Sequence, residues 1–441
     1  MQDSYAGLKA WVATVDMGLG HQRATYPLLR VAEDGLITVG RESTSDPAEQ
    51  KLWNRMRRTY ESLSRVRSVP IIGRPLFGLL DAMQNIPPFY PISDMSRPSV
   101  QVKLLSSFID KGLCRGMVEK IQANPLPLIT SYLAPAMAAD KARHGRIYCI
   151  ICDAEINRAW VAEDPASSRI HYLAPCGRAV MRLKSYGVPD ERIFLSGFPL
   201  PLEVLGGEDL ALLKADVAQR LFRLDPRDRF WPLHGRNVLH FLEDHNCQDK
   251  SDRSLTITFA VGGAGAQTEI AHQIALSLRD QIERGEIRLN LVAGIREEVN
   301  TLFEKIKADI LPGSPHLRII YDSNIRGYFR KFSDVIRTTD VLWTKPSELS
   351  FYCGLGMPII IAPPIGAQEL YNRKWLLEIQ AGIDQEDPAY TSQWLMDLLA
   401  EGRLAESAWD GFLKARKFGT YKVFEILETG TMAREKSPLK R

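Results

Sequence analysis

The residues best equipped to bind a ligand gather in one stretch of the sequence, residues 344–372. The stretch begins with the polar run TKPSE, which follows the apolar run Asp340–Trp343 and predicts a turn that opens a helix at Ser347. A second apolar run, Ile359–Ala362, predicts a buried strand that ends in a loop with proline and glycine. The hydroxyl, carboxylate and amide groups of the two loops suit the hydroxyls of a sugar nucleotide. The candidates are Thr344, Lys345, Ser347, Glu348, Gln368, Glu369 and Asn372.

A glycine turn, GGAGAQ, follows the apolar run Leu255–Val261 and precedes a predicted helix. Glycines at such a turn let backbone N–H groups face a diphosphate, and the helix N-terminus attracts negative charge. Gln267, just inside the helix, could bond either the phosphates or the helix's own cap. A purely structural turn is the alternative. The glycines concerned are Gly262, Gly263 and Gly265.

Strands and helices that alternate along the chain must position these loops. In both halves, apolar runs of strand length are separated by stretches of helix length. The runs are Leu8–Val15, Pro127–Thr130, Arg146–Asp153, Arg169–Pro175, Arg192–Leu200, Leu255–Val261, Leu289–Gly294 and Leu317–Tyr321. This alternation predicts the α/β class, with a parallel, doubly wound sheet in each half. Such sheets bind ligands at their carboxyl edge.

A segment rich in proline and glycine, Phe198–Asp209, predicts a hinge between two domains. We expect an N-terminal domain at residues 1–205, a C-terminal domain at 206–415, and a C-terminal helix with a basic tail at 416–441. Residues Asp225–Asp252 show no clear periodicity and are expected to form a surface insertion. Helical spacing is found at Arg23–Ala32.

Composition narrows the function classes. The chain has 441 residues, 45% hydrophobic and 25% charged, which suits two domains of about 200 residues each. Its net charge of +3 is too small to suggest nucleic acid as a partner.

No apolar run approaches the roughly 18–20 residues of a membrane span, and MQDSYAGLK does not read as a signal sequence, so a cytoplasmic protein is expected. Cys149 and Cys152 would point to opposite faces of a strand, which makes a shared metal improbable.

Five motifs occur in an order that resembles a known family. They are VDMGLGH, YLAPCGRAVMRLKSYGVPDERIFLSGFPL, FAVGGAGAQ, DVLWTKPSELSF followed by GLGMP, and GAQELYN. The ordered set is similar to the two-domain (GT-B type) nucleotide-sugar glycosyltransferases that include the UDP-GlcNAc transferase of peptidoglycan synthesis. It resembles most the monogalactosyldiacylglycerol synthases and diacylglycerol glucosyltransferases. The resemblance extends from Val12 to Asn372.

The resemblance implies two facing Rossmann-like domains with an inter-domain cleft. It implies a UDP-sugar donor bound by the C-terminal domain and a hydroxyl acceptor, a membrane lipid, bound by the N-terminal domain. Inversion at the anomeric carbon, no metal and no cofactor are implied as well. The nucleobase would contact main-chain groups of Ser323, Asn324 and Ile325, although a structural loop explains these residues equally well.

Two spacings depart from the family pattern. In the family an acidic residue bonds both ribose hydroxyls, and its position falls near Phe351, one helical turn after Glu348. Glu348 can serve because one turn returns a side chain to nearly the same face, while an interaction with the helix dipole is the alternative. Gln368 and Glu369 resemble the pair that reads sugar hydroxyls, with one extra residue, Ala367, before them.

His21 and Asp153 are the candidate bases for an acceptor hydroxyl that must lose a proton. His21 follows the turn of Gly18 and Gly20, which is expected to face the acceptor and the donor phosphates. There the helix dipole would favour the neutral imidazole, and a solvated surface histidine is the alternative.

Asp153 and Trp160 resemble the ends of the family's Asp…His…Trp segment. Asn157 and Arg158 stand where the family has a histidine. The resemblance implies that Asp153 is either the base or the group that orients His21, and the missing histidine is a departure from the family pattern.

A basic and aromatic segment between Leu52 and Met117 departs from the alternating pattern. Helical spacing places Trp53, Met56, Tyr60 and Leu63 on one face. The arginines around them are Arg55, Arg57, Arg58, Arg65 and Arg67. With the short apolar runs Pro75–Met83 and Ile86–Ile92, this pattern predicts peripheral contact with an anionic inner membrane face. Packing in the core is the alternative.

Two other functions stay open. An enzyme similar to UDP-GlcNAc 2-epimerases would consume a UDP-sugar without any acceptor. A non-catalytic nucleotide-sugar-binding protein would bind UDP and turn nothing over.

Overall fold

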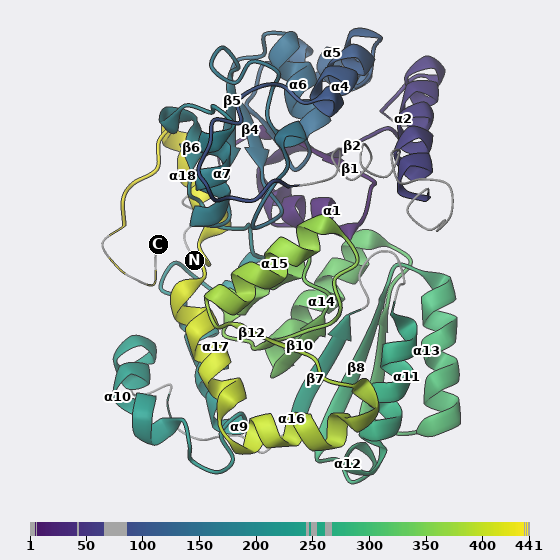
Figure 1. Ribbon diagram of the computed structural model, residues 1–441, viewed down its shortest axis with the longest axis vertical. Helices are drawn as coiled ribbons and strands as arrows, with labels where there is room; N and C mark the ends of the chain where they lie inside the picture. The colour runs from purple at the N-terminus through teal and green to yellow at the C-terminus, as the bar shows by residue number, and fades with distance from the viewer. Residues whose placement is uncertain are drawn as a thin grey trace. The chain divides into compact units, whose positions relative to one another are not determined.

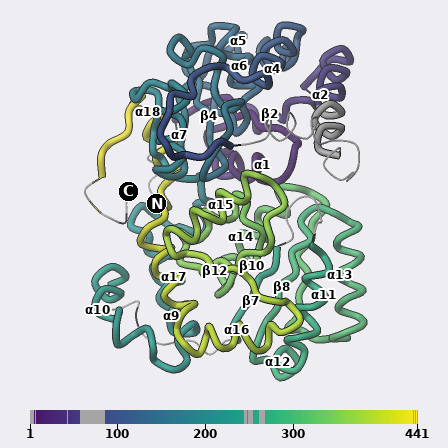
Figure 2. The backbone as a smooth tube through the Cα atoms, in the orientation of Figure 1, coloured from purple at the N-terminus to yellow at the C-terminus, as the bar shows by residue number. Residues whose placement is uncertain are grey.

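The computed structural model of the chain describes residues 5, 7–41, 44–65, 86–243, 247, 254–260, 267–435, 437 and 439 (Figure 1). The chain forms two compact units. The N-terminal unit contains residues 2–199 and 419–433, and the C-terminal unit contains residues 200–418 and 434–441. Figure 2 traces the backbone through both units.

The N-terminal unit is built on a six-stranded parallel sheet in the order β2-β1-β3-β4-β5-β6. The strands are β1 (Ala10–Val15), β2 (Ala32–Val39), β3 (Leu128–Thr130), β4 (Ile147–Ile150), β5 (Ile170–Leu173) and β6 (Ile193–Phe194). Every residue of β1, β3 and β4 is buried, because helices cover both faces of a parallel sheet. The helices are α1 (Leu19–Thr25), η1 (Tyr26–Val31), α2 (Pro47–Arg65), α4 (Val100–Asp110), α5 (Arg115–Ala123), α6 (Leu133–Lys141), η3 (Arg158–Trp160), α7 (Gly177–Ser185), η4 (Asp190–Arg192) and α18 (Gly419–Thr429).

The C-terminal unit contains a second six-stranded parallel sheet, in the order β12-β11-β10-β7-β8-β9. The strands are β7 (Leu255–Ala260), β8 (Ile287–Gly294), β9 (Leu317–Tyr321), β10 (Val341–Thr344), β11 (Ile359–Ile361) and β12 (Gly382–Asp384). The helices are α8 (Leu202–Leu205), α9 (Ala211–Arg223), α10 (Trp231–Leu242), α11 (Thr268–Ser277), α12 (Arg279–Glu283), α13 (Glu297–Ile310), α14 (Ile325–Thr338), η6 (Glu348–Leu355), α15 (Ala367–Glu378), η7 (Pro388–Tyr390), α16 (Thr391–Ala400) and α17 (Arg403–Lys414). Helices α11 and α13 pack together along this sheet (Figure 1).

Each sheet has a point where the order of its strands reverses. In the N-terminal unit the first strand, β1, lies between β2 and β3, and in the C-terminal unit the first strand, β7, lies between β8 and β10. Ligands of doubly wound sheets bind beyond the carboxyl ends of the two strands at such a switch point. The expected α/β fold with two Rossmann-like domains is confirmed.

Several predicted elements differ in length or type. The helix expected at Arg23–Ala32 is α1 followed by the 3-10 helix η1, because Pro27 supplies no N–H to continue an α-helix. Within the stretch expected to lack periodicity, Trp231–Leu242 forms helix α10. The strand expected at Arg146–Asp153 ends at Ile150, so Cys152 lies beyond it.

One residue of the predicted membrane face, Trp53 of helix α2, is instead packed in the core. Trp53 is only 2% exposed, and its indole nitrogen donates to Glu49 Oε1 at 3.1 Å. Glu49 also accepts from the backbone nitrogens of Cys114 and Gly116, which fixes the start of α2 to the unit. Trp53 is thus a core residue. Arg57, Arg58, Tyr60, Leu63 and Arg65 have side chains outside the described part of the chain, and Arg67 and Pro75–Met83 lie outside the described residues. None of the described helices has both the length and the apolar character needed to cross a bilayer.

Candidate functional site

The switch point of the N-terminal unit carries the predicted base His21. The turn after β1 reaches Gly18, whose φ of 113° favours glycine, and helix α1 then presents Gly20 and His21. Ser131 follows β3, the strand beside β1. The Nδ1 atom of His21 lies 2.7 Å from the carbonyl oxygen of Ser131. The hydrogen bond therefore spans the carboxyl ends of the two strands where ligands of this sheet class bind.

This hydrogen bond determines the tautomer of the neutral ring. A carbonyl oxygen can only accept, so Nδ1 must carry the proton. In the neutral imidazole the lone pair then resides on Nε2, the atom that can take a proton from a substrate. The helix dipole expected from the sequence concerns whether the ring is neutral, whereas this hydrogen bond determines which nitrogen of the neutral ring carries the proton.

Three further side chains surround the His21 ring. The Cys152 sulfur lies 3.8 Å from Nδ1, and the ring centroids of Tyr132 and Trp160 lie 5.2 Å and 5.9 Å from that of His21. Asp153, the other predicted base, is half-buried and directly follows Cys152. Ser131, Tyr132 and Cys152 were missed as site residues. The available signal was their place just after β3 and β4, the strands nearest β1 on that side.

Asn157 and Arg158, in the segment where a histidine was expected from the resemblance, have structural partners. Asn157 is the N-cap of η3 and accepts from the Ala159 nitrogen at 3.1 Å. Arg158 is buried, and its guanidinium donates to main-chain carbonyls, among them that of Val161 at 2.7 Å. The segment therefore places Trp160 beside His21 without a second histidine.

The switch point of the C-terminal unit brings together most of the predicted donor-binding residues. Thr344 Oγ1 donates to the Ala260 carbonyl at 3.0 Å and joins the ends of β10 and β7. Lys345, the next residue, forms an ion pair with Glu369 of α15, and both side chains are largely buried. Glu369 also accepts from the Ile365 nitrogen at 2.7 Å. Its carboxylate therefore already has partners, a fact that the sequence did not reveal.

Two amides fix neighbouring loops at the same edge. Asn372 is fully buried and donates through Nδ2 to the Pro346 carbonyl at 3.1 Å. Gln267, the N-cap of α11, donates through Nε2 to the Pro363 carbonyl at 2.6 Å. Its Oε1 atom is buried without a hydrogen-bond partner among the residues that the structure describes. That oxygen has the capacity to accept from a ligand.

The helix expected at Ser347 is the 3-10 helix η6, with Ser347 as its N-cap and Glu348 as its first residue. Both residues are half-buried. Phe351, where the family's acidic residue would fall, is 2% exposed and packs on Trp375 with ring centroids 5.0 Å apart. Glu348 is thus the carboxylate that this helix start presents. The side chain of Gln368, at the start of α15, makes no hydrogen bond to the residues that the structure describes.

The remaining predicted residues lie apart from this group. Asn324 is the N-cap of α14, where it accepts from the nitrogens of Arg326 and Gly327, and Ser323 and Ile325 flank it. They follow β9, three strands from β10, a distance of about 14 Å at the usual strand spacing. Gly262, Gly263 and Gly265 lie outside the described residues. Among the residues that are described, no three His, Cys, Asp or Glu side chains come together as metal ligands.

No protein-family model and no curated protein matches the sequence. Solved structures do resemble the fold. The Staphylococcus aureus MnaA structure with UDP aligns at 11% identity and a TM-score of 0.48, covering 96% of each chain. The UDP-GlcNAc 2-epimerase from Neisseria meningitidis, bound to UDP-GlcNAc, aligns at 10% identity and a TM-score of 0.47, covering 96% of this chain and 98% of the other.

A third solved structure, the glycosyltransferase of kitacinnamycin, aligns at 11% identity and a TM-score of 0.47, covering 96% of this chain and 98% of the other. Likenesses this distant do not carry an activity from one protein to another.

Proposed function

We propose that the chain is an inverting, metal-independent glycosyltransferase that moves a sugar from a UDP-sugar to a hydroxyl group of a lipid. The observation that carries the proposal is the hydrogen bond from His21 Nδ1 to the Ser131 carbonyl. It leaves the lone pair of the neutral ring on Nε2, at a switch point where a substrate of this sheet class binds. A general base is what hydroxyl attack requires.

The reaction balances with these parts. The acceptor oxygen attacks the anomeric carbon and forms the new glycosidic bond, while His21 Nε2 takes the hydroxyl proton. The bond between the anomeric carbon and the β-phosphate oxygen breaks, and UDP leaves with the electron pair. In this proposal Asp153 either replaces His21 as the base or orients it.

The C-terminal unit supplies the donor site in this proposal. Glu348 offers two acceptor oxygens to the ribose hydroxyls, and Gln368 offers an amide to the sugar. Lys345 would line the same loop while paired with Glu369, and the buried Oε1 atom of Gln267 would accept a hydrogen bond from the ligand. Ser323, Asn324 and Ile325 would contact the base, and Gly262, Gly263 and Gly265 the phosphates.

A lipid acceptor is the finer part of the proposal. It is supported by large apolar side chains that the N-terminal unit exposes: Tyr90 at 72%, Ile92 at 73% and Val100 at 69%. Exposed apolar groups close together in sequence are suited to an interface or an acyl chain.

A UDP-release assay over a panel of UDP-sugars, with and without lipid extract, tests the proposal. Release that requires both one UDP-sugar and the extract supports lipid glycosylation. Release without any acceptor, or conversion of the donor sugar, would instead identify an epimerase-like enzyme. Binding of UDP without release under any condition would identify a nucleotide-sugar-binding protein.

A further inference from the structure

The segment 86–98 of the N-terminal unit, which we call the proline strap, forms neither helix nor strand. It contains Pro87, Pro88, Pro91 and Pro98, which have no N–H to give to a sheet ladder. Its carbonyl groups need donors from elsewhere when the segment packs on the unit. Two buried arginines supply them, one near each end of the strap.

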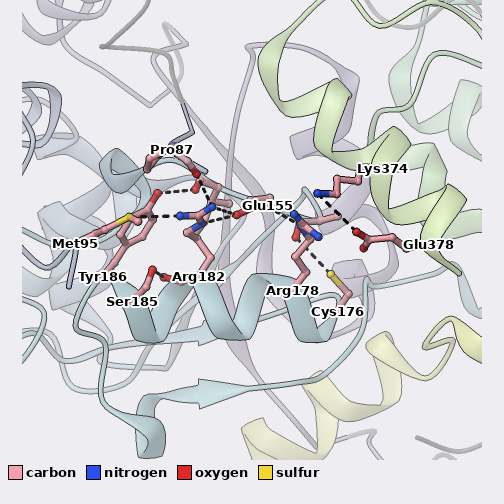
Figure 3. Close-up of polar contacts among 12 residues, drawn as sticks. Pro87, Met95, Glu155, Cys176, Arg178, Arg182, Ser185, Tyr186, Lys374 and Glu378 are labelled. Atoms are coloured by element: carbon pink, nitrogen blue, oxygen red, sulfur yellow. Dashed lines mark hydrogen bonds and ion pairs between the residues drawn. The ribbon is translucent and has the colours of Figure 1, made fainter. Parts of the chain in front are cut away.

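Arg182 of α7 holds the first end. Its side chain is fully buried, its Nη2 donates to the Pro87 carbonyl at 2.8 Å, and its Nη1 lies 3.5 Å from Met95 Sδ (Figure 3). The guanidinium carbon lies 5.1 Å from the centroid of the Phe89 ring. Buried Glu155 forms an ion pair with Arg182 and so compensates its charge.

Arg158 holds the second end. Its Nε and Nη2 donate to the Ser96 carbonyl at 3.1 Å and 2.8 Å. The same guanidinium donates to the carbonyls of Val161 at 2.7 Å and Glu163 at 3.2 Å. Burial lowers the pKa of Arg158. The guanidinium places donors on three separate nitrogens, which lets it reach carbonyls of both the strap and the loop, whereas the donors of a lysine share one nitrogen.

Glu155, Arg158 and Trp160 all belong to the loop that follows β4. Trp160 is two residues from Arg158, and its ring centroid lies 5.9 Å from that of His21 and 6.2 Å from that of Tyr132. The hydrogen bonds of Arg158 therefore fix the loop next to the ring that packs on the proposed base.

We propose that Arg158 is a positioning residue, which ties the proline strap to the loop after β4 so that Trp160 holds the His21 ring in place. The catalytic consequence rests on the proposed function, whereas the structural coupling does not. Arg158 would thus position the His21 ring from the segment in which the resembling family has a histidine.

The coupling can be measured without activity. In an NMR spectrum of protein labelled at histidine, the Hε1 resonance of His21 is the one that disappears in His21→Gln. The variant Trp160→Leu then gives the chemical shift that this resonance has without the ring current of the indole. We expect Arg158→Lys to move the His21 resonance toward the Trp160→Leu position. The control Arg146→Lys also loses a guanidinium bond to a carbonyl, that of Leu427 at 3.1 Å, but Arg146 precedes β4 at the opposite edge of the sheet. It should leave the resonance in place.

A second variant covers the case in which Arg158→Lys does not fold. Asp94 is exposed and accepts from the Ser96 nitrogen at 2.9 Å, so Asp94→Ala loosens the same end of the strap from the surface. It should shift the His21 resonance in the same direction by a smaller amount. A wild-type position in the folded variant, or an equal shift in Arg146→Lys, overturns the coupling.

Turnover tests the catalytic consequence separately. Arg158→Lys should lower kcat by about 10- to 100-fold and leave KM for the UDP-sugar unchanged, because the base is displaced and the donor site is not. A shifted resonance with wild-type kcat overturns this consequence. If the wild-type protein releases no UDP, the proposed function fails, and the resonance positions still decide the coupling.

Discussion

At the scale of single residues, the Ser131 carbonyl decides what His21 can do. We expect His21→Ala to lower kcat by about 100-fold or more, because the proton acceptor is lost, while UDP affinity stays nearly intact. Initial-rate kinetics and UDP titration separate the two quantities. The chain offers a control in His144, which is buried and also bonds a carbonyl, that of Leu126 at 2.7 Å, but lies before β4 at the opposite sheet edge.

His144→Ala should retain wild-type kcat. Wild-type turnover in His21→Ala would make His21 structural and Asp153 the leading base. An equal loss in both variants would point to a general loss of stability.

The donor residues lead to a second prediction at this scale. Glu348→Ala and Gln368→Ala should each weaken binding of the UDP-sugar by about 1–3 kcal/mol, because each leaves a buried ligand hydroxyl without its partner. Calorimetric titration measures the loss. Glu378→Ala, at the far end of α15, should bind as the wild type does. Unchanged affinity in both site variants would place the donor in a different loop.

At the scale of elements, the sequence predicted the strands and their loops better than the contacts between them. The buried strands of the two parallel sheets read as continuous apolar runs, so β1, β7 and β10 were foreseen. His21 and Ser131 are separated by 110 positions, and no local pattern links them. The same is true of Lys345 and Glu369, whose ion pair depends on how α15 packs after β11.

The end of η6 gives a third prediction. Gly356 has a φ of +67°, and a Cβ there would lie 2.7 Å from Val217 Cγ2 of α9. Gly356→Ala therefore combines backbone strain of about 1–2 kcal/mol with a clash in a packed core. We expect a clear loss of unfolding free energy in urea.

Gly313→Ala isolates the backbone contribution. Gly313 has a φ of +73°, and a Cβ there would meet no atom within 4 Å. This variant should lose only about 1–2 kcal/mol. Equal losses in the two variants would mean that α9 moves aside, and that the close approach to Val217 carries no cost.

At the scale of the whole molecule, the end of the chain returns to the unit in which the chain began, and composition does not predict this return. The last long helix, α18, belongs to the N-terminal unit, where Leu427 accepts from Arg146 at 3.1 Å and Phe424 packs near Tyr5 at 5.2 Å. Gly419 is the first residue of α18, where a Cβ would lie 2.1 Å from the carbonyl oxygen of Phe198. The close approach of the two backbones therefore requires glycine at this position. The buried face of α18 appears in the sequence as ordinary helical spacing, which does not say which sheet it covers.

Membrane contact, which the proposed lipid acceptor calls for, can be tested at the scale of the whole molecule. Trp53 is buried, so an interface would have to use other residues of the N-terminal unit, such as the exposed Tyr90 and Ile92. We expect the protein to float with anionic vesicles at low salt and less so at high salt, because each basic residue near the surface adds about 1 kcal/mol. Neutral vesicles should bind it more weakly.

Two variants and a control complete the flotation test. Arg57→Glu with Arg58→Glu should reduce flotation by removing the attraction, and Tyr90→Ser with Ile92→Ser by removing the apolar contact. Leu233→Ser is the matched control, because Leu233 is 75% exposed but belongs to α10 of the C-terminal unit. It should float as the wild type does. Should the wild-type protein stay in the soluble fraction with both vesicle types at low salt, a soluble sugar or small molecule becomes the better acceptor.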